Sequence, residues 1–382
     1  MLLEVFIAFV IALLTVGWVH SKIVRIARMK NIVDNPNTRK LQRVPIPVLG
    51  GVAVFLGIIS GIGCLGFFSD VSSLLIAVTA MVVMLYVGTM DDILNLSPNL
   101  RFLIETLVVL LVILVGGRSI DDFHGLWGIH EIPYGIAIPL TVFASVGIIN
   151  AINLIDGVNG LSSGFCIMAC LVFGTLFVLA GDTKMAILAS AATGALIPFF
   201  LHNVFGKTSR MFIGDGGTLM MGIVMSVFVI NTLSHDSLCA TYVGPQVGLI
   251  PFSLAVLCIP VFDTLRVMST RMAKGISPFH PDKTHLHHRF IEMGCSHLGT
   301  TGRILTLNGL ILFVWWILRR LGVSIDIQLY AVIVMGMFAT IGIYYLVEAF
   351  PSRKSSCQTS KSTFQMKRHK ATLAIRRWMD KI

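Results

Sequence analysis

Long apolar segments constrain the fold of this chain more than any other feature of its sequence. A helix that crosses a membrane needs about 20 predominantly apolar residues, and backbone groups in lipid must be paired within the segment. Hydrophobic residues make up 55% of the 382 residues, and charged residues only 13%. We therefore expect an all-α polytopic membrane protein with about 11 transmembrane helices. The predicted spans are residues 2–19, 48–68, 71–89, 102–116, 135–155, 163–180, 185–202, 217–233, 247–263, 304–320 and 328–347.

The distribution of Lys and Arg predicts the orientation of these spans. Basic residues gather in the cytoplasmic loops of membrane proteins, and several follow the first segment within residues 22–30. No positive region precedes that segment, which favours a retained span with its N-terminus outside over a cleaved signal peptide. Alternation from there places the C-terminus inside. It leaves few basic residues on the outer side, namely Arg118, Lys184, Arg319 and Arg320.

Basic residues in the predicted cytoplasmic segments account for the net charge of +10, which therefore does not indicate a nucleic-acid partner. Residues 1–347 are predicted to form an integral membrane domain, and residues 348–382 a basic cytoplasmic tail. The tail either binds anionic lipid headgroups, which attract basic segments near the surface, or is simply solvated. The sequence leaves both alternatives open.

Two pairs of adjacent aspartates differ in their surroundings. Asp91 and Asp92 close the third predicted span on the inner side, where repulsion between neighbouring carboxylates must be relieved by a cation or a proton. A hard divalent ion such as Mg²⁺ suits carboxylate oxygens and substrate phosphates, although a solvated turn would also explain a lone pair. Asp121 and Asp122 fall in the outer loop 117–134. There we expect a surface turn or a small external β-hairpin.

Polar residues recur every three positions at the end of the fifth predicted span. Asn150, Asn153 and Asp156 therefore project from one face of the helix, and inside an apolar segment they require partners or a water-filled cavity. Hydrogen bonds between helices would explain the asparagines alone. They do not explain the aspartate or the glycines that follow it at Gly157 and Gly160. This spacing favours a functional site.

Two further aspartates lie on the inner side of the predicted bundle. Asp215 stands among three glycines at the start of the eighth span, where free backbone N–H groups and small residues admit a phosphate or a metal phosphate. Asn203, at the inner end of the seventh span, is a weaker candidate for the same cavity. Asp263 ends the ninth span, where it either belongs to the site or forms a simple ion pair with Arg266.

Histidines are concentrated between the ninth and tenth spans, where His285, His287 and His288 follow Lys283 and precede Arg289. Ionisable groups clustered in a membrane protein indicate a functional site. The spacing is not that of a common zinc site, and no cysteine assists. The imidazoles with the neighbouring cations look more like a clamp for a diphosphate.

Taken in order and all on the inner side, these motifs resemble those of the polyprenyl-phosphate N-acetylhexosamine-1-phosphate transferases, the WecA/MraY superfamily of the glycosyltransferase family 4 type. The split histidine motif is similar to that of the WecA-like branch, because the MraY-like branch has an uninterrupted triplet. The resemblance spans about residues 30–300. Its segments are Arg39-Lys40, Pro47–Gly51, Asp91-Asp92, Asn150–Leu161, Phe212–Asp215, Asp263 and His285–His288.

The resemblance implies a reaction and its setting. Members of this superfamily move a sugar 1-phosphate from a UDP-activated N-acetylhexosamine onto a membrane polyprenyl phosphate and release UMP with Mg²⁺, with Mn²⁺ as the alternative ion. We therefore expect UDP-GlcNAc as the donor and undecaprenyl phosphate as the acceptor, in the first step of cell-surface polysaccharide synthesis. The setting would be the bacterial inner membrane, with the site on its cytoplasmic face. A homodimer is compatible with this setting.

Site roles carry over by matching positions. Asp215 is expected to bind Mg²⁺, with Asp91 and Asp92 as supporting ligands or as the base at the lipid phosphate. Asn153 and Asp156 are expected to contact the nucleotide, and the histidines to hold the diphosphate and the sugar. The catalytic candidates are Asp91, Asp92, Asp156, His285, His287 and His288. The substrate-binding candidates are Arg43, Asn150, Asn153, Asn159, Asn203, Asp263, Arg271 and Arg289.

The chain departs from the pattern of the superfamily at three places. Asn159 replaces the second acid of the usual motif, Gln42 replaces a frequent histidine, and the loop from Asn203 to Asp215 is slightly longer. Two alternatives remain open. A MraY-like enzyme would take a peptide-bearing UDP-MurNAc donor. A secondary transporter would have polar groups near the middle of the membrane and an internal repeat, whereas here the polar groups cluster at inner helix ends.

Overall fold

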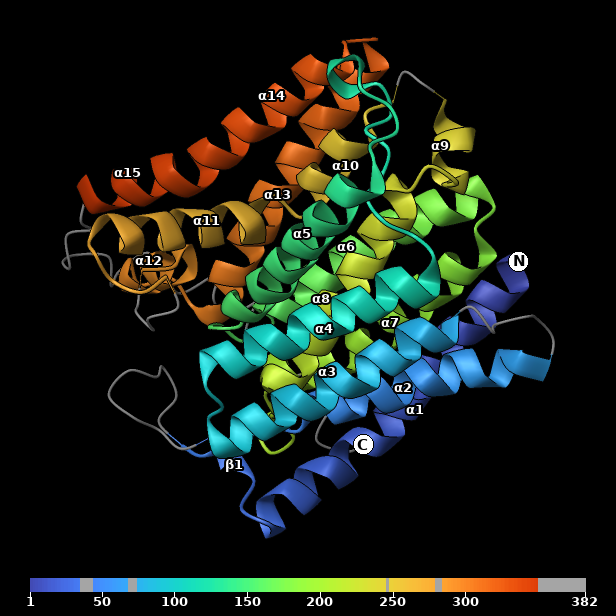
Figure 1. Ribbon diagram of the computed structural model, residues 1–382. Helices are drawn as coiled ribbons and strands as arrows, with labels where there is room; N and C mark the ends of the chain where they lie inside the picture. The colour runs from blue at the N-terminus through green and yellow to red at the C-terminus, as the bar shows by residue number, and fades with distance from the viewer. Residues whose placement is uncertain (35–43, 68–73, 245–246, 279–283, 350–382) are drawn as a thin grey trace, which may run out of the picture.

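The computed structural model describes residues 1–34, 44–67, 74–244, 247–278 and 284–349, and this part of the chain is almost entirely helical (Figure 1). The predicted basic tail lies outside the described residues from residue 350 onward. The first half contains α1 (Leu2–Met29), β1 (Val33–Asp34), β2 (Ile46–Pro47), α2 (Gly50–Gly63), the 3-10 helix η1 (Cys64–Phe67), α3 (Leu74–Leu94), α4 (Pro98–Gly116), the 3-10 helix η2 (Leu126–Gly128) and α5 (Tyr134–Leu154). The second half contains α6 (Leu161–Ala180), α7 (Thr183–Phe205), α8 (Gly214–Leu233), α9 (Leu238–Val243), α10 (Leu249–Val256), α11 (Cys258–Ala273), α12 (Leu286–Glu292), α13 (His297–Arg320), α14 (Ile325–Met337), the π-helix η3 (Phe338–Gly342) and α15 (Ile343–Ala349).

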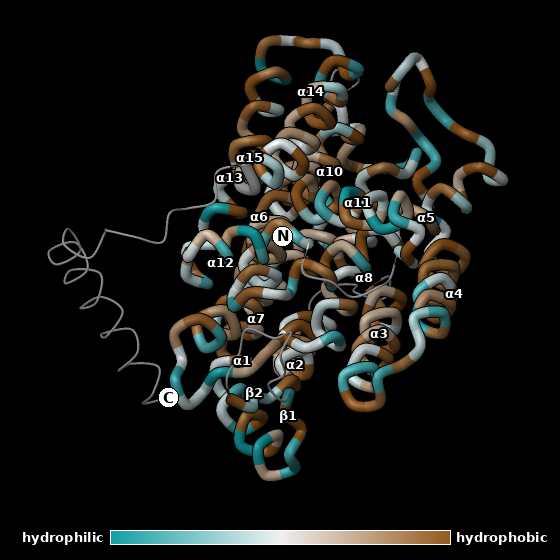
Figure 2. The backbone as a smooth tube through the Cα atoms, turned by 90° about the vertical axis from the view of Figure 1, so that its left-hand side faces the viewer, coloured by the Kyte–Doolittle hydropathy of each residue, from teal (hydrophilic) through white to brown (hydrophobic). Residues whose placement is uncertain are grey.

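The predicted all-α membrane architecture is confirmed. Nine helices in the described residues are long and apolar enough to cross a membrane, and the number rises to ten if the bent pair α10 and α11 forms one span. Helix is present in every predicted span, but the second is shorter than expected, with an apolar helix over Gly50–Gly66. Apolar residues dominate the length of the helices, whereas hydrophilic residues gather at their ends and in the turns (Figure 2).

The ninth predicted span, residues 247–263, is a bent pair of helices in place of one continuous helix. Helices α10 and α11 meet at an angle of 75° near Leu257. Pro260 cannot donate a backbone hydrogen bond, which weakens the helix here. Asn308 of α13 binds the freed backbone groups, because its Nδ2 donates to the carbonyls of Ala255 and Val256 and its Oδ1 accepts from the N–H of Ile259. The bend directs α11 away from α10 and toward the histidine segment.

Helix α8 forms the centre of the bundle, and almost all of its side chains are buried. It packs against α3, α5 and α2. Glycines permit the close approach, since a Cβ at Gly88 of α3 would overlap the backbone of Asp215 and Gly216. Small residues of this kind let transmembrane helices pack closely where lipid provides no hydrophobic driving force. The start of α8 is thereby held against the end of α3.

The helix ends define two faces of the protein. On one face lie the end of α3, the start of α8 and the antiparallel pair β1 and β2, in which Val33 is opposite Pro47. The N-terminus lies at the other end of α1, away from this pair (Figure 1). The polar motifs of the sequence therefore share the face opposite to the N-terminus, as the alternating spans predict.

The outer loop 117–134 matches the expected surface turn and hairpin only in part. The described residues contain one isolated bridge there, between Asp122 and Glu131, instead of paired strands. Asp121 is buried, accepts a hydrogen bond from the backbone N–H of His235 at 2.8 Å and pairs with the imidazole Nδ1 of His235 at 3.1 Å. The prediction of a surface turn is wrong for Asp121, because its carboxylate joins this loop to the segment after α8.

Candidate active site

A polar cavity of 1070 Å³ opens at the face that carries the sequence motifs. It lies where the end of α3, the turn between α5 and α6, the end of α7 and the starts of α8 and α13 come together. Most of the predicted acidic and amide residues contribute to its wall. Its polar lining includes Asp91, Asp92, Asp156, Asn159, Asn203, Arg210, Asp215, His288 and His297.

Backbone hydrogen bonds between two distant glycine-rich segments shape the floor of this cavity. The N–H of Gly50 donates to the carbonyl of Phe212 at 3.0 Å, and the N–H of Gly51 donates to the carbonyl of Ile213 at 2.7 Å. Gly214 follows with φ of 72°, and a Cβ there would come 2.6 Å from Oδ2 of Asp92. Only glycine fits this left-handed position without strain. The turn therefore delivers Asp215 to the cavity beside Asp92.

Asp92 and Asp215 are the two carboxylates best placed for a metal ion. Both line the cavity, and the N–H of Gly216 reaches Oδ2 of Asp92 at 3.5 Å. Asp91 is oriented differently, since it accepts hydrogen bonds from the N–H of Leu96 at 2.8 Å and from Nη1 of Arg101 at 3.1 Å. Within the described residues, no three His, Cys, Asp or Glu side chains form a metal-binding group. Mg²⁺ commonly takes one or two carboxylates and completes its shell with water and phosphate oxygens, so this pair fits such an ion.

Asp156 lines the cavity, and Asn153 lies next to it through its bond to Asp215. Nδ2 of Asn153 donates to Oδ1 of Asp215 and to Oγ1 of Thr218, each at 2.8 Å. Asp156 accepts a hydrogen bond from Oγ of Ser162 at 2.6 Å. Removal from water, assisted by the negative charge of Asp215 and opposed by the hydrogen bond from Ser162, raises the pKa of Asp156 to about 6. Asp156 is therefore mostly ionised at neutral pH and becomes protonated in mild acid.

Asn159 and Asn203 reach the cavity from different elements. Asn159 is fixed through its backbone, because its N–H donates to Nδ1 of His297 at 3.3 Å and its carbonyl accepts from Oγ1 of Thr301 at 3.1 Å. Nδ2 of Asn203 donates to the carbonyl of Met211 at 2.8 Å, which braces the loop before Asp215. Both side chains therefore belong to the cavity wall, and Asn203 also supports the loop of a neighbouring motif.

The three described histidines of the HxHH motif have different environments. His288 lines the cavity, whereas His285 and His287 are buried beneath it. Burial lowers the pKa of His287 well below its usual range, with the neighbouring imidazoles adding to the effect, so this ring is neutral. It packs against Gly157, where any Cβ would overlap the ring. His288 is therefore the histidine of this group best placed to touch a ligand.

Several predicted substrate-binding residues are directed away from the cavity. Asp263 is buried and pairs with Nδ1 of His285 at 2.9 Å and with Nη2 of Arg266 at 2.6 Å. Arg271 donates to the carbonyl of Pro278 at 2.5 Å, and Arg289 to the hydroxyl of Tyr344 at 2.6 Å. Asp263 and Arg289 hold the histidine segment in place, and Arg271 fixes the loop after α11. Arg43 lies outside the described residues.

An arginine and a glutamate on α4 complete the site and escaped the sequence interpretation. Arg101 donates to Asp91 and to Oδ1 of Asn150, and its Nε lies 3.4 Å from Oε1 of the fully buried Glu105. Nδ2 of Asn150 donates in turn to Oε2 of Glu105 at 2.5 Å. Glu105 lies inside the predicted span 102–116, where an ionisable residue by itself indicates a functional role. That signal was present in the sequence.

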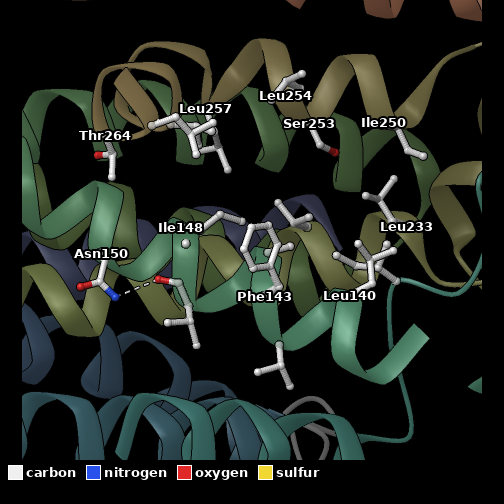
Figure 3. A pocket seen from close by; sticks show the side chains of 18 of the residues that line it. Leu140, Phe143, Ile148, Asn150, Leu233, Ile250, Ser253, Leu254, Leu257 and Thr264 are labelled. Atoms are coloured by element: carbon white, nitrogen blue, oxygen red, sulfur yellow. Dashed lines mark hydrogen bonds between the residues drawn. The ribbon is translucent and has the colours of Figure 1, made fainter. Parts of the chain in front are cut away.

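A second, apolar pocket of 560 Å³ begins beside this polar group. Figure 3 shows Asn150 and Thr264 toward one end of it, with Phe143, Ile148 and Leu257 along its wall. Its lining comes from α5, from both halves of the bent pair, from α8 and from the outer loop. Asn150 lines the apolar pocket and Asp91 lines the polar cavity, and Arg101 binds both residues. Arg101 therefore links one lining residue of each pocket.

The sequence is similar to those of bacterial proteins named as sugar 1-phosphate transferases. Residues 73–233 match glycosyl transferase family 4. A Bacillus subtilis (strain 168) protein named as a probable undecaprenyl-phosphate N-acetylglucosaminyl 1-phosphate transferase is 30% identical over 297 residues, which are 78% of this chain and 80% of the relative. The undecaprenyl-phosphate alpha-N-acetylglucosaminyl 1-phosphate transferases of Escherichia coli (strain K12) and Yersinia pestis are 29% and 28% identical, each over 71% of this chain and 72% of the relative. Together with the cavity and its motifs, these similarities show that the chain belongs to glycosyl transferase family 4.

Proposed function

We propose that this protein transfers N-acetylglucosamine 1-phosphate from UDP-GlcNAc to undecaprenyl phosphate and releases UMP. The observation that carries the proposal is a carboxylate-lined cavity and an apolar pocket whose linings are linked through Arg101. A soluble nucleotide sugar needs the first, and a polyprenyl chain needs the second. The bacterial relatives are named for the same acceptor and the same sugar, which supports the proposal.

The apolar pocket suits the part of a polyprenyl chain next to its phosphate. Nearly its whole surface is hydrocarbon, and a volume of 560 Å³ holds only the first isoprenoid units. The remaining chain would stay in the lipid, where its burial costs nothing further. A phosphate at the polar end of the pocket would lie near Arg101, whose planar guanidinium binds phosphate oxygens well.

The polar cavity suits the diphosphate of the donor. Asp92 and Asp215 would hold a Mg²⁺ ion, which would neutralise charge on the phosphates and polarise the bond to be broken. His288 and Arg210 lie in the same wall and add donors for phosphate oxygens or sugar hydroxyls. Asp156 is ionised at neutral pH and accepts hydrogen bonds from hydroxyl groups of the donor. Asn153 holds Asp215 in its orientation through the 2.8 Å bond.

The net reaction balances without a redox partner. An oxygen of the lipid phosphate becomes bonded to the phosphorus that carries the sugar, and the bond from that phosphorus to the bridging oxygen of UMP breaks. The protein supplies position and charge compensation, which dominate phosphoryl transfer. The reaction would take place at the cytoplasmic face of the inner membrane, which the positive-inside distribution and the position of the cavity support.

Transfer of label into lipid tests this function. The full chain in membranes is incubated with undecaprenyl phosphate and, in separate reactions, radiolabelled UDP-GlcNAc, UDP-GalNAc, UDP-glucose and UDP-MurNAc-pentapeptide. We expect labelled lipid from UDP-GlcNAc or its close N-acetyl analogue, release of UMP, and no product when undecaprenol replaces the phosphate. Transfer from the pentapeptide donor alone would move the chain to the MraY-like alternative. No transfer from any donor, with the protein folded, would contradict the proposal.

A further inference from the structure

Tyr344, on the last described helix, lies between two arginines that support the histidine segment. The ring centroid is 4.1 Å from Cζ of Arg266 and 4.5 Å from Cζ of Arg289. The phenol oxygen accepts a hydrogen bond from Nη2 of Arg289 at 2.6 Å. Tyr344 itself is only 8% exposed. A buried ring contacted by two guanidinium groups, one of them also bound to its hydroxyl, is a strong local contact, because cation–π attraction grows when water is excluded.

The two arginines connect Tyr344 to both ends of α12. Arg266 donates to Oδ1 of Asp263 at 2.6 Å and to the carbonyl of Thr284 at 2.7 Å, just before α12 begins. Asp263 in turn accepts from the N–H of Leu286 at 3.2 Å. Arg289 belongs to α12 itself and lies in its last turn. One tyrosine thus contacts the groups that fix where α12 starts and where it ends.

His288 lies between those two anchored points. It belongs to the first half of α12, lines the polar cavity and packs against His287, with ring centroids 4.3 Å apart. His287 stacks in turn near His285, whose Nδ1 is held by Asp263. Any movement of α12 therefore changes the position of the His288 ring in the cavity.

The local structure of the last span sets the direction of Tyr344. The π-helix η3 (Phe338–Gly342) precedes α15, and one extra residue in a turn rotates the following helix by about 100°. Gly336 fixes the same span against α11, because a Cβ there would come 2.6 Å from the ring of Phe262 and 2.7 Å from Sγ of Cys258. Short π-helical bulges within α-helices are frequent at functional sites. Here the turn directs the tyrosine toward the two arginines.

We propose that Tyr344 is a positioning residue, which holds α12 against α11 and thereby sets His288 in the cavity. The inference rests on the proposed function for its catalytic consequence, although the effect on α12 is independent of it. The last span thus acts on the site from outside, since none of its described residues is in the lining of the polar cavity. Loss of the ring should loosen α12 and weaken productive binding of the donor, while the apolar pocket and its lipid are unaffected.

Two substitutions distinguish the effect of the Tyr344 ring from that of its hydroxyl group, and a third is a matched control. Tyr344→Leu removes both the ring and the hydrogen bond, whereas Tyr344→Phe retains the ring over both arginines. Tyr330→Leu alters a tyrosine of the same span at the other face, where its hydroxyl accepts a hydrogen bond from Trp127. All three are prepared as full-length protein in lipid nanodiscs, and their melting temperatures are recorded to exclude general unfolding.

Hydrogen exchange of residues 284–293 provides the first readout and does not depend on activity. We expect exchange in Tyr344→Leu to be at least about fivefold faster than in the wild type, because α12 opens locally. Tyr344→Phe should stay within about twofold of the wild type, because the cation–π contact remains. Tyr330→Leu should leave this segment unchanged. Unchanged exchange of residues 284–293 in Tyr344→Leu would overturn the positioning role.

Steady-state kinetics provide the second readout. In Tyr344→Leu we expect kcat/KM for UDP-GlcNAc to fall about tenfold, while KM for undecaprenyl phosphate stays within about twofold of the wild type. Tyr344→Phe should retain most of the wild-type kcat/KM. Equal losses for both substrates would indicate general damage and contradict the proposal. If the wild type transfers no sugar phosphate, the proposed function fails, and the exchange measurement alone decides the role of Tyr344.

Discussion

At the scale of single residues, the structure separates side chains that reach the cavity from those that hold other side chains. Asp92, Asp156, Asp215 and His288 line it, whereas Asp263 and its partners lie behind it. The distinction matters for mutagenesis, because the loss of a group that stabilises the transition state lowers turnover directly. The loss of a buried supporting charge damages folding first, since it leaves its partner unpaired.

Asp215→Asn tests a side chain that reaches the cavity. The substitution keeps the shape of the side chain and removes the charge that we propose binds the metal, so we expect kcat to fall by at least about 100-fold. Asp182→Asn is the matched control, because Asp182 caps α7 at the opposite face and asparagine caps a helix equally well. Both are measured as label transferred to lipid per folded protein. Equal losses in the two variants would exclude the metal-binding role of Asp215.

Asn159→Asp tests whether the chain lacks an acid that it needs. The backbone of Asn159 is fixed by His297 and Thr301, so the substitution changes charge without moving the loop. We expect the rate to change by less than about tenfold, or 1.4 kcal/mol, because Asp92, Asp156 and Asp215 already supply carboxylates to the cavity. A much larger gain, measured in the same assay, would show that an acid at position 159 is required.

At the scale of elements, the site depends on two helices that approach more closely than ordinary side chains allow. Gly88 brings α3 against the first turn of α8, and so brings Asp92 beside Asp215. On the outer face, a hydrogen-bonded pair of the buried Asp121 and the exposed His235 joins the loop after α4 to the segment after α8. We therefore expect the contact between α3 and α8 to be sensitive to substitution, and the Asp121–His235 pair to be sensitive to pH.

Gly88→Ala should separate α3 from α8. The added methyl group would overlap the backbone of Asp215 and Gly216, so we expect a loss of stability of about 1–3 kcal/mol and a marked loss of activity. Gly17→Ala is the control, because no atom lies within 4 Å of a Cβ at that position of α1 and alanine favours helix. Thermal unfolding in detergent, followed with a thiol-reactive dye, compares the two. Equal stability in both variants would contradict the packing described for α3.

The stability of the outer face should depend on pH. The hydrogen bond and negative charge of Asp121 raise the pKa of His235 above its usual value of 6.5. The stabilisation that the protonated His235 gains from Asp121 is therefore fully present below pH 6.5. It disappears as the pH rises through the raised pKa of His235 in the folded protein. Hydrogen exchange of residues 117–124 should accelerate between pH 6 and pH 8 beyond the intrinsic rate change. His235→Gln should abolish the extra acceleration, and its persistence in that variant would refute the assignment.

At the scale of the whole molecule, one face carries the cavity and the other carries the N-terminus and the outer loop. The proposed cytoplasmic orientation of the cavity predicts which sites are labelled in intact cells. In a cysteine-free background, Lys274→Cys, an exposed position after α11, should resist an impermeant maleimide until the membrane is opened. His130→Cys, exposed in the outer loop, should react without opening. The reverse pattern would place the cavity outside.

The sequence by itself determined the membrane architecture, because a span is a local property. About 20 apolar residues in succession bury themselves in lipid whatever their neighbours are, and the charges that flank them set their direction. The spacing of Asn153 and Asp156 likewise sufficed to place both at one site, since residues three apart share a helix face. The motif residues Asp92 and Asp215 could be identified for the same reason, as carboxylates at helix ends on one side.

Only the tertiary structure decided which of the polar groups face the cavity. His288 is in its wall while His285 and His287 are beneath it, because α12 docks on α11 through Asp263 and Arg266, contacts between residues distant in the sequence. The bend at Leu257 depends on Asn308 from another helix, and the role of Tyr344 depends on a π-turn in the last span. Such contacts join positions that no local pattern relates. Their free energy arises only when the helices pack, and they therefore become visible only in the folded protein.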